Sequence, residues 1–413
     1  MLRKKLFALT ALSGLLLASA ASAETIKFAL IEGLSGPFAA NGQAALREFT
    51  FATEKFINDK GGVAGGTTVE FIGLDNKTSP KESLIQLKNA IGQGVQYVFQ
   101  GNSSGVANAI SAAVEKYNRR NPEKPVLYIN YAAVDPALTN EKCNFWHFRF
   151  DANADMKMKA IVQQLKDRPE IKKVYLIGQD YSFGKAVAAA ARKYLGEIRP
   201  DIEIVGEELH PIGKVKDFTP YVTKIKASGA DAVFTGNWGS DMVNLAKASN
   251  DIGLDADFFT YYAAGTGITA TIGAAGKDRI MVVQEGQRNP VVTDAWDNYL
   301  TEFTAKYQGA DILYPRVVYA IQMLAKAMDE ANSVKPLDVA LTLEDMKFTT
   351  LVGNDIFMRA KDHQLMMPLN IAVHTNEEIK WDYDKSGYGL KTMATIPIAE
   401  VDTGTSCEMK RPG

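Results

Sequence analysis

A serine-rich turn in the first third of the chain has the residue types that either catalysis or anion binding requires. Residues 101–105 (GNSSG) follow an apolar run and open a segment of helical pattern. The spacing fits G-x-S-x-G, in which Ser103 would be the nucleophile of a serine hydrolase, with a later aspartate and His363 or His374 as partners. At a helix N-terminus the same turn would instead offer N–H groups and hydroxyls to an anion, or would only cap the helix.

The rest of the sequence favours the anion-binding interpretation. It contains no HGGG-type segment that could build an oxyanion hole, and both late histidines fall in segments that indicate edge strands or surface. We therefore expect the turn to hold an anion through Ser103 or Ser104. A hydrolase acting through Ser103 is the alternative of another class.

Two glycine-rich segments resemble nucleotide-binding motifs only in part. Residues 265–270 (GTGITA) fit the dinucleotide fingerprint, with Glu285 at the matching distance, but a lone match of this kind has little specificity. Residues 178–185 (GQDYSFGK) have one residue too many for a P-loop, and predict a strand-to-helix loop that presents Tyr181 and Phe183. The four histidines show no metal-ligand spacing. We therefore expect no cofactor, no metal and no catalytic residue.

Aromatic side chains gather in the loops that follow predicted strands. These residues are Phe38, Tyr131, Tyr181, Phe183, Trp238, Tyr261 and Tyr262. Ligands of open α/β sheets bind in the crevice beyond the carboxyl ends of the strands. Each of these aromatic side chains either packs in the core or lines such a cleft.

The elements that must position these residues alternate between strand and helix. Strands are predicted over 25–31, 68–74, 96–100 and 125–131, and helices over 39–60, 80–91 and 104–120. The alternation restarts with strands over 173–177, 203–207, 232–235, 258–262 and 279–284, again separated by helical patterns. Two such series predict an α/β protein with two doubly wound parallel-sheet lobes.

The pattern changes after Pro290. Amphipathic helices are predicted over 295–306, 315–331 and 337–343 with no strand between them, so they must cover a sheet that already exists. We expect this segment to return to the first lobe. Residues 356–358, 369–374 and 379–383 indicate antiparallel edge strands.

Composition and the first residues indicate an exported globular protein. The 413 residues are 46% hydrophobic and 23% charged, with a net charge of -2, so no basic surface for nucleic acid is expected. A basic start, a short apolar run and small residues at 21–23 form a secretory signal peptide over residues 1–23, cleaved after Ala23. Cys143 and Cys407, the two cysteines, are therefore disulfide candidates, with two buried free thiols as the alternative.

Several dispersed motifs together resemble one family. They are residues 33–38 (GLSGPF), 41–44 (NGQA), 57–63 (INDKGGV), 102–104 (NSS), 132–139 (AAVDPALT) and 230–233 (ADAV). In this order they are similar to the Leu/Ile/Val-binding proteins, the periplasmic solute-binding components of branched-chain and amide-type amino-acid ABC importers. The resemblance covers essentially the whole chain after residue 23.

The resemblance implies a type I periplasmic-binding clamshell, whose lobes are joined by a hinge of three crossings near 148–151, 285–289 and 362–367. The implied units are an N-terminal lobe of 24–149 plus 287–365, a C-terminal lobe of 150–286 plus 366–400, and a tail of 401–413. A ligand bound between the lobes stabilises the closed form, which the membrane permease recognises. The implied location is the periplasm, and no reaction is catalysed. A sensor built on the same clamshell is a further possibility.

The ligand residues that the resemblance implies come from both lobes. The ligand carboxylate meets Ser103 or Ser104 and then Ala132 and Val134 in the first lobe; the second lobe offers Tyr181, Phe183, Asn237 or Trp238, and Tyr262. Tyr262 stands where the family binds the ammonium group with an acid, and Asn41 stands where it has an aromatic residue. Glu285, Asp241 or tyrosine hydroxyls are the available substitutes for that acid.

Two ligand classes follow. The family favours a branched-chain or related amino acid, which requires an acidic side chain near the ammonium group. The alternative is an aromatic carboxylate that stacks on Trp238 and Tyr262. The expected partners are this small molecule and an ABC transporter permease.

Overall fold

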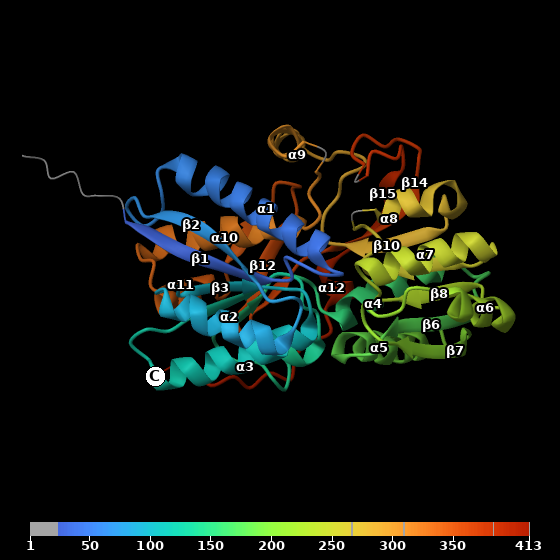
Figure 1. Cartoon of the computed structure of the whole chain (residues 1–413), viewed down its shortest axis with the longest axis horizontal. Coiled ribbons are helices and arrows are strands. Elements are labelled where there is room, and N and C mark those ends of the chain that lie inside the picture. Colours follow the sequence, from blue (N-terminus) through green and yellow to red (C-terminus); the bar gives the residue numbers. More distant parts are fainter. Residues whose placement is uncertain (1–23, 266, 309, 383, 413) are drawn as a thin grey trace, which may run out of the picture.

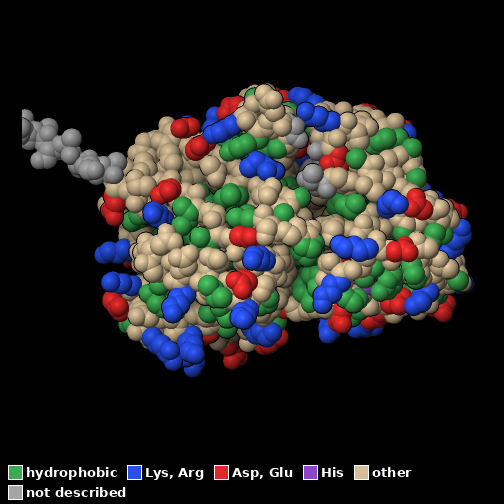
Figure 2. Space-filling model, in the orientation of Figure 1, with side chains coloured by type: hydrophobic (Ala, Val, Ile, Leu, Met, Phe, Trp, Pro, Cys, Tyr) green, Lys and Arg blue, Asp and Glu red, His purple; other side chains and the backbone are tan. Residues whose placement is uncertain are grey.

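The protein consists of two α/β lobes that lie side by side along its long axis (Figure 1). The computed structural model describes residues 24–265, 267–308, 310–382 and 384–412, so the predicted signal peptide lies outside the described residues. Positive and negative side chains are interspersed over the face of both lobes seen in Figure 2. Within the described residues, no helix is long and apolar enough to cross a bilayer.

The sheet of the first lobe has the strand order β11-β12-β13-β5-β4-β3-β1-β2. Its strands are β1 (Thr25–Glu32), β2 (Thr68–Asp75), β3 (Tyr97–Gln100), β4 (Leu127–Asn130), β5 (His147–Arg149), β11 (Lys347–Thr349), β12 (Asp355–Arg359) and β13 (Gln364–Met366). Strands β1 to β5 are parallel to one another, whereas β12 pairs antiparallel with both β11 and β13. The helices between the first strands are α1 (Ala39–Phe56), α2 (Pro80–Gly92) and α3 (Ser104–Arg120).

The sheet of the second lobe has the strand order β15-β14-β10-β9-β8-β6-β7. Its strands are β6 (Lys173–Gln179), β7 (Glu203–His210), β8 (Ala232–Thr235), β9 (Asp257–Thr260), β10 (Ile280–Gln284), β14 (Leu369–Thr375) and β15 (Gly389–Ile396). Its helices are α4 (Ala154–Gln164), α5 (Ser182–Ile198), α6 (Thr219–Ser228), α7 (Ser240–Ile252), α8 (Ile268–Ile272) and α12 (Ile398–Val401). The predicted fold class, two doubly wound lobes, is confirmed.

Strand β1 shows why four consecutive residues, 28–31, are apolar. Phe28 and Leu30 pack into one buried cluster, whereas Ala29 and Ile31 pack into another. Both faces of the sheet are therefore covered here, as a parallel sheet requires, and this part of the strand is a continuous apolar run.

The helices after Pro290 return to the first lobe, as expected. They are α9 (Asp294–Lys306), α10 (Pro315–Ala331) and α11 (Pro336–Leu343). Helix α10 packs against α1. The ring of Phe51 in α1 lies against Tyr299 and Phe303 in α9, with centroids 5.2 and 5.3 Å away.

The strand predicted over 379–383 is wrong for residues 379–382, and residue 383 lies outside the described residues. The backbone N–H groups of Lys380 and Trp381 donate to the Oδ1 atom of Asn289, so they are not available to a neighbouring strand. The strand that pairs with β14 is instead β15. The sequence did not predict it because apolar residues of β15 such as Met393, which is 53% exposed, do not follow its burial. The strands predicted at 356–358 and 369–374 are antiparallel but not edge strands, because β11 and β15 lie outside them.

The C-terminal tail is covalently joined to the first lobe. Cys143 and Cys407 form a disulfide with their Cα atoms 5.7 Å apart, as predicted. Nearby, the Thr405 hydroxyl donates to the carbonyl of Thr139. The tail therefore crosses from the second lobe back to the first.

Candidate ligand-binding site

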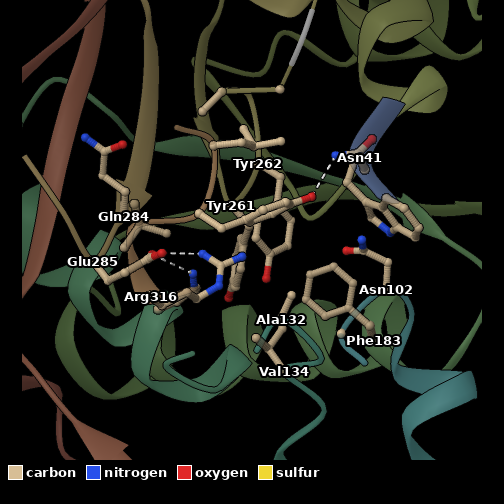
Figure 3. Close-up of a pocket in the computed structure, with 18 of the residues that line it drawn as sticks. Asn41, Asn102, Ala132, Val134, Phe183, Tyr261, Tyr262, Gln284, Glu285 and Arg316 are labelled. Carbon is tan, nitrogen blue, oxygen red and sulfur yellow. Dashed lines mark hydrogen bonds and ion pairs between the residues drawn. The ribbon is translucent and has the colours of Figure 1, made fainter. Parts of the chain in front are cut away.

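A cavity lies where the carboxyl ends of strands from both sheets face one another (Figure 3). Its lining comes from the turns after β3, β4, β8 and β9, from the end of β10, and from the starts of α5 and α10. The lining includes Asn41, Gly101, Asn102, Ser103, Ser104, Ala132, Val134, Lys157, Tyr181, Phe183, Trp238, Tyr261, Tyr262, Gln284, Glu285, Tyr314 and Arg316. The two lobes thus share one site.

The serine-rich turn forms one part of the lining. Helix α3 begins at Ser104, and Ser103 precedes it in an extended conformation with no side-chain capping bond. The Oγ atom of Ser104 accepts a hydrogen bond from the backbone N–H of Asp135 at 3.2 Å. The start of a 17-residue helix therefore reaches the cavity, and it carries partial positive charge.

A buried glutamate holds this turn from behind. Oε1 of Glu32 accepts the backbone N–H groups of Gly101 at 2.7 Å and Asn102 at 2.8 Å, and the Tyr131 hydroxyl at 2.8 Å. Burial raises the pKa of Glu32 to about 7, although these hydrogen bonds oppose the rise. Two N–H groups of the turn are thus already used by the protein, which leaves those of Ser103 and Ser104 for a ligand.

A second buried glutamate holds the loop before α10 in the same way. The Glu48 carboxylate accepts the backbone N–H groups of Leu313 at 2.6 Å and Tyr314 at 2.9 Å, and both of these residues line the cavity. Burial raises the pKa of Glu48 to about 8. Two cavity loops of the first lobe are therefore fixed by carboxylates that are fully removed from solvent.

Aromatic rings line much of the cavity. The Trp238 indole N–H donates to the Tyr181 hydroxyl at 2.9 Å. Phe38 of the first lobe lies against Trp238 of the second, with ring centroids 4.1 Å apart. The Asn41 amide donates to the Tyr314 hydroxyl at 3.1 Å. These rings give an apolar ligand body a wall contributed by both lobes.

Four buried charged residues form a closed quartet beside the cavity. Lys157 Nζ lies 2.8 Å from Asp151 Oδ1 and 3.8 Å from Glu285 Oε2. Arg316 pairs with Glu285 through Nη1, and its Nε atom lies 3.4 Å from Asp151 Oδ2. All four side chains are at most 4% exposed. The quartet joins Arg316 of the first lobe and Lys157 of the second to Asp151 and Glu285, which fall in two of the three predicted crossings.

The quartet determines the charge states of its members. Burial opposes ionisation of Glu285, but Arg316 and Lys157 outweigh it and hold the pKa of Glu285 below its usual value. Burial also disfavours the charged form of Arg316, but the two carboxylates raise its pKa well above the ordinary value. Both residues are charged at neutral pH.

The structure brings nearly all the sequence-predicted site residues together. Ser103, Ser104, Ala132, Val134, Tyr181, Phe183, Trp238, Tyr262 and Glu285 all line the cavity. Asn237 does not, because its side chain is fully buried and its Oδ1 atom lies 3.0 Å from His210 Nε2. Asp241 is also absent from the lining, because its carboxylate accepts hydrogen bonds from Gln179 and from the backbone of Gly213.

Sequence reasoning missed three of the four quartet residues, Asp151, Lys157 and Arg316. A signal existed for the two bases, since each stands on the apolar face of its helix. Lys157 shares a face with Ile161, four residues on, and Arg316 shares one with Ala320. A charged residue on the apolar face of a helix is buried and needs a buried partner.

The histidines do not complete a hydrolase. The prediction that His363 and His374 lie on an edge strand or the surface is wrong, because both are fully buried. His363 stacks on Phe148 and pairs with Glu344 at 2.7 Å, while His374 stacks on Tyr388. No histidine is among the described residues that line the cavity, so the lining offers Ser103 no imidazole base.

Comparison with known proteins agrees with this architecture. The family model described as "Periplasmic binding protein" matches residues 25–377. This chain belongs to the periplasmic binding protein family. The Leu/Ile/Val-binding protein homolog 4 of Brucella abortus is 34% identical to this chain over 409 residues. The match covers 96% of this chain and 95% of that relative.

Solved structures of similar proteins extend the comparison. The closed conformation of the leucine-, isoleucine-, valine-, threonine- and alanine-binding protein of Brucella ovis is 33% identical, with a TM-score of 0.85, over 94% of this binding protein and 100% of that chain. A solute-binding protein of Rhodopseudomonas palustris in complex with p-hydroxybenzoic acid is 19% identical, with a TM-score of 0.76. That match covers 91% of this chain and 98% of the other. The chain thus shares its two-lobed fold with both solved binding proteins.

Proposed function

We propose that the protein is the periplasmic solute-binding component of an ABC importer and that it encloses a small carboxylate-bearing solute between its lobes. The observation that carries this proposal is the cavity itself, which both lobes and the hinge residue Glu285 line. A solute that contacts both lobes favours the closed arrangement over an open one. The permease would then recognise the closed form and receive the solute.

Binding of the carboxylate is supported by the serine-rich turn. The N–H groups and hydroxyls of Ser103 and Ser104 stand at the start of α3, where the helix dipole favours negative charge. Ala132 and Val134 lie in the next turn of the lining. The body of the solute would pack on Phe183 and Trp238.

Two solute classes fit this description. A branched-chain or related amino acid is favoured by the relatives, among them the leucine-, isoleucine-, valine-, threonine- and alanine-binding protein of Pseudomonas aeruginosa, which is 26% identical over 85% of this chain. An aromatic carboxylate is favoured by the rings of Tyr181, Phe183, Trp238, Tyr262 and Tyr314.

Export and hinge motion complete the proposal. The signal peptide over 1–23 would be removed after Ala23 and release the protein into the periplasm. Residues 24–149 with 287–365 would move as one lobe, and residues 150–286 with 366–400 as the other. The tail, 401–413, would stay attached to the first lobe through Cys407.

A thermal-shift screen of the mature protein tests this function. The screen would contain amino acids, aliphatic carboxylates and aromatic carboxylates. A solute at a hundredfold excess over its Kd stabilises the folded state by about 2.7 kcal/mol, which gives a clear rise in Tm. The proposal fails if no solute raises Tm and the protein hydrolyses a generic ester in a reaction that Ser103→Ala abolishes.

A further inference from the structure

We infer that the solute is a carboxylate without an ammonium group, and that Arg316 donates to one of its oxygens. This inference rests on the proposed function and names the solute class for the same cavity. It is carried by the charge balance of the quartet and by one buried nitrogen of Arg316.

The acidic groups near the cavity are already occupied. Glu285 is the sole carboxylate among the described lining residues, and its two oxygens face Arg316 and Lys157. Asp151, behind it, pairs with Lys157 through Oδ1 and accepts the Tyr262 hydroxyl through Oδ2 at 3.3 Å. An amino acid would bring an ammonium group into a site where each carboxylate is already neutralised.

The balance of charge leads to the same conclusion. The two acidic side chains, Asp151 and Glu285, are matched in number by the two basic ones, Lys157 and Arg316, and each acid contacts both bases. An ammonium group placed at the quartet would therefore have no carboxylate free to pair with it there, and burial of an unpaired ammonium group is strongly unfavourable. An amine-free anion brings no such group.

Arg316 has one donor that the protein does not use. Its Nε donates to the carbonyl of Tyr131 and its Nη1 to Glu285, but Nη2 is buried and has no hydrogen-bond partner among the described residues. Figure 3 shows the guanidinium group with Glu285 on one side and Tyr261 and Tyr262 on the other, so it faces the aromatic part of the lining. A buried charged donor without a partner is costly, and a solute oxygen would satisfy it.

The Arg316 donor and the serine-rich turn therefore define a solute by what it must and must not carry. It must have oxygen acceptors for Ser103, Ser104 and Arg316, and an apolar body for the aromatic wall. It must not carry a cation at the quartet. Simple aryl and branched aliphatic carboxylates meet these conditions.

Matched pairs of solutes test the inference on the unmodified mature protein. Isothermal titration calorimetry would compare L-leucine with 4-methylpentanoate and L-phenylalanine with 3-phenylpropanoate, which differ only by the amine. Benzoate, 4-hydroxybenzoate and the remaining amino acids complete the panel. We expect the amine-free member of each pair to bind at least tenfold more tightly, and the tightest solute of the panel to lack an amine.

The outcomes separate this inference from the proposed function. If an amino acid binds most tightly, the protein is still a solute-binding component but the inference is overturned. If no solute of the panel binds, both the inference and the proposed carboxylate-binding function are overturned. A tightest solute that lacks an amine supports both.

A variant of Arg316 tests its role directly. Arg316→Lys keeps the charge beside Glu285 but removes Nη2, and we expect it to weaken binding of the amine-free acid at least tenfold. Lys326→Gln, an exposed position on the same helix, is the matched control and should bind normally. Circular dichroism and Tm establish that each variant is folded. Unchanged affinity in folded Arg316→Lys would overturn the assignment, and the matched pairs remain decisive if that variant does not fold.

Discussion

At the scale of single residues, the cavity is held by buried carboxylates that touch backbone rather than solute. Glu32 fixes the serine-rich turn, and Glu48 fixes the loop before α10. Each glutamate accepts hydrogen bonds from backbone N–H groups that would otherwise face the cavity or its surroundings unpaired. The shape of the site therefore depends on residues behind its surface.

The raised pKa of Glu32 predicts how stability varies with pH. Because the folded state raises this pKa from 4.5 to about 7, the folded protein binds the proton more tightly than the unfolded chain does. The contribution of Glu32 to stability is thus greatest below pH 4.5 and is lost as the pH rises towards 7. Gln does not titrate. The unfolding free energy of Glu32→Gln, relative to that of the original protein, should therefore rise by up to about 3 kcal/mol between pH 4.5 and 7.

Urea unfolding of both proteins between pH 4.5 and 8 measures this gain. Glu70→Gln, at an exposed position on the neighbouring strand β2, is the control and should show no such trend. A difference between Glu32→Gln and the original protein that is constant across the range would contradict the account.

Trp238 is the residue whose loss should affect binding most without disturbing charge. It contacts Phe38 across the cleft and hydrogen-bonds Tyr181, so Trp238→Ala removes the ring from both the wall and the contact between lobes. We expect at least a tenfold weaker Kd for the solute found in the screen. Trp146→Phe, outside the cavity lining, should bind as before; equal affinity in Trp238→Ala would contradict the proposed wall.

At the scale of elements, tight packing sets the position of the serine-rich turn. A Cβ atom on Gly101 would lie 2.6 Å from the Cβ of Ala132 and 2.7 Å from its backbone nitrogen, which leaves no room for a side chain between the two cavity turns. We predict that Gly101→Ala lowers stability by about 1–3 kcal/mol and weakens solute binding.

Gly92 gives a matched control for that substitution. A Cβ atom there would meet nothing within 4 Å, and the residue ends a helix. Gly92→Ala should therefore leave Tm and affinity nearly unchanged. If Gly101→Ala behaves like Gly92→Ala in chemical unfolding and calorimetry, the packing argument is wrong.

Sequence patterns predicted elements well where both faces of a strand are buried or where helices are amphipathic. The apolar run of β1 and the helical spacing of α10 each reflect local burial, so local sequence carries the signal. The pattern at 379–383 predicted a strand wrongly because the N–H groups of Lys380 and Trp381 donate to Asn289, which is distant in the sequence. Asp151, Lys157 and Arg316 were missed for a similar reason, because they meet Glu285 only after both lobes have folded.

At the scale of the whole molecule, the disulfide joins the C-terminal tail, which follows the second lobe, to Cys143 in the first lobe. Cys143 and Cys407 are separated by 264 residues, and a loop of that length gives an entropic stabilisation of about 5 kcal/mol in the ideal case. We predict that the Cys143→Ser, Cys407→Ser double variant unfolds at a lower temperature but keeps its affinity, because neither residue lines the cavity. Calorimetric unfolding and titration check the two halves of this prediction, and an unchanged Tm would contradict the first.

The central claim is that the lobes close on a carboxylate held between them. Small-angle X-ray scattering of the mature protein, with and without a saturating concentration of the tightest solute from the panel, tests it most directly. We predict that the radius of gyration falls when the solute is added, and that Trp238→Ala needs at least tenfold more solute for the same fall. Scattering curves that remain identical while calorimetry shows the site to be full would contradict the account.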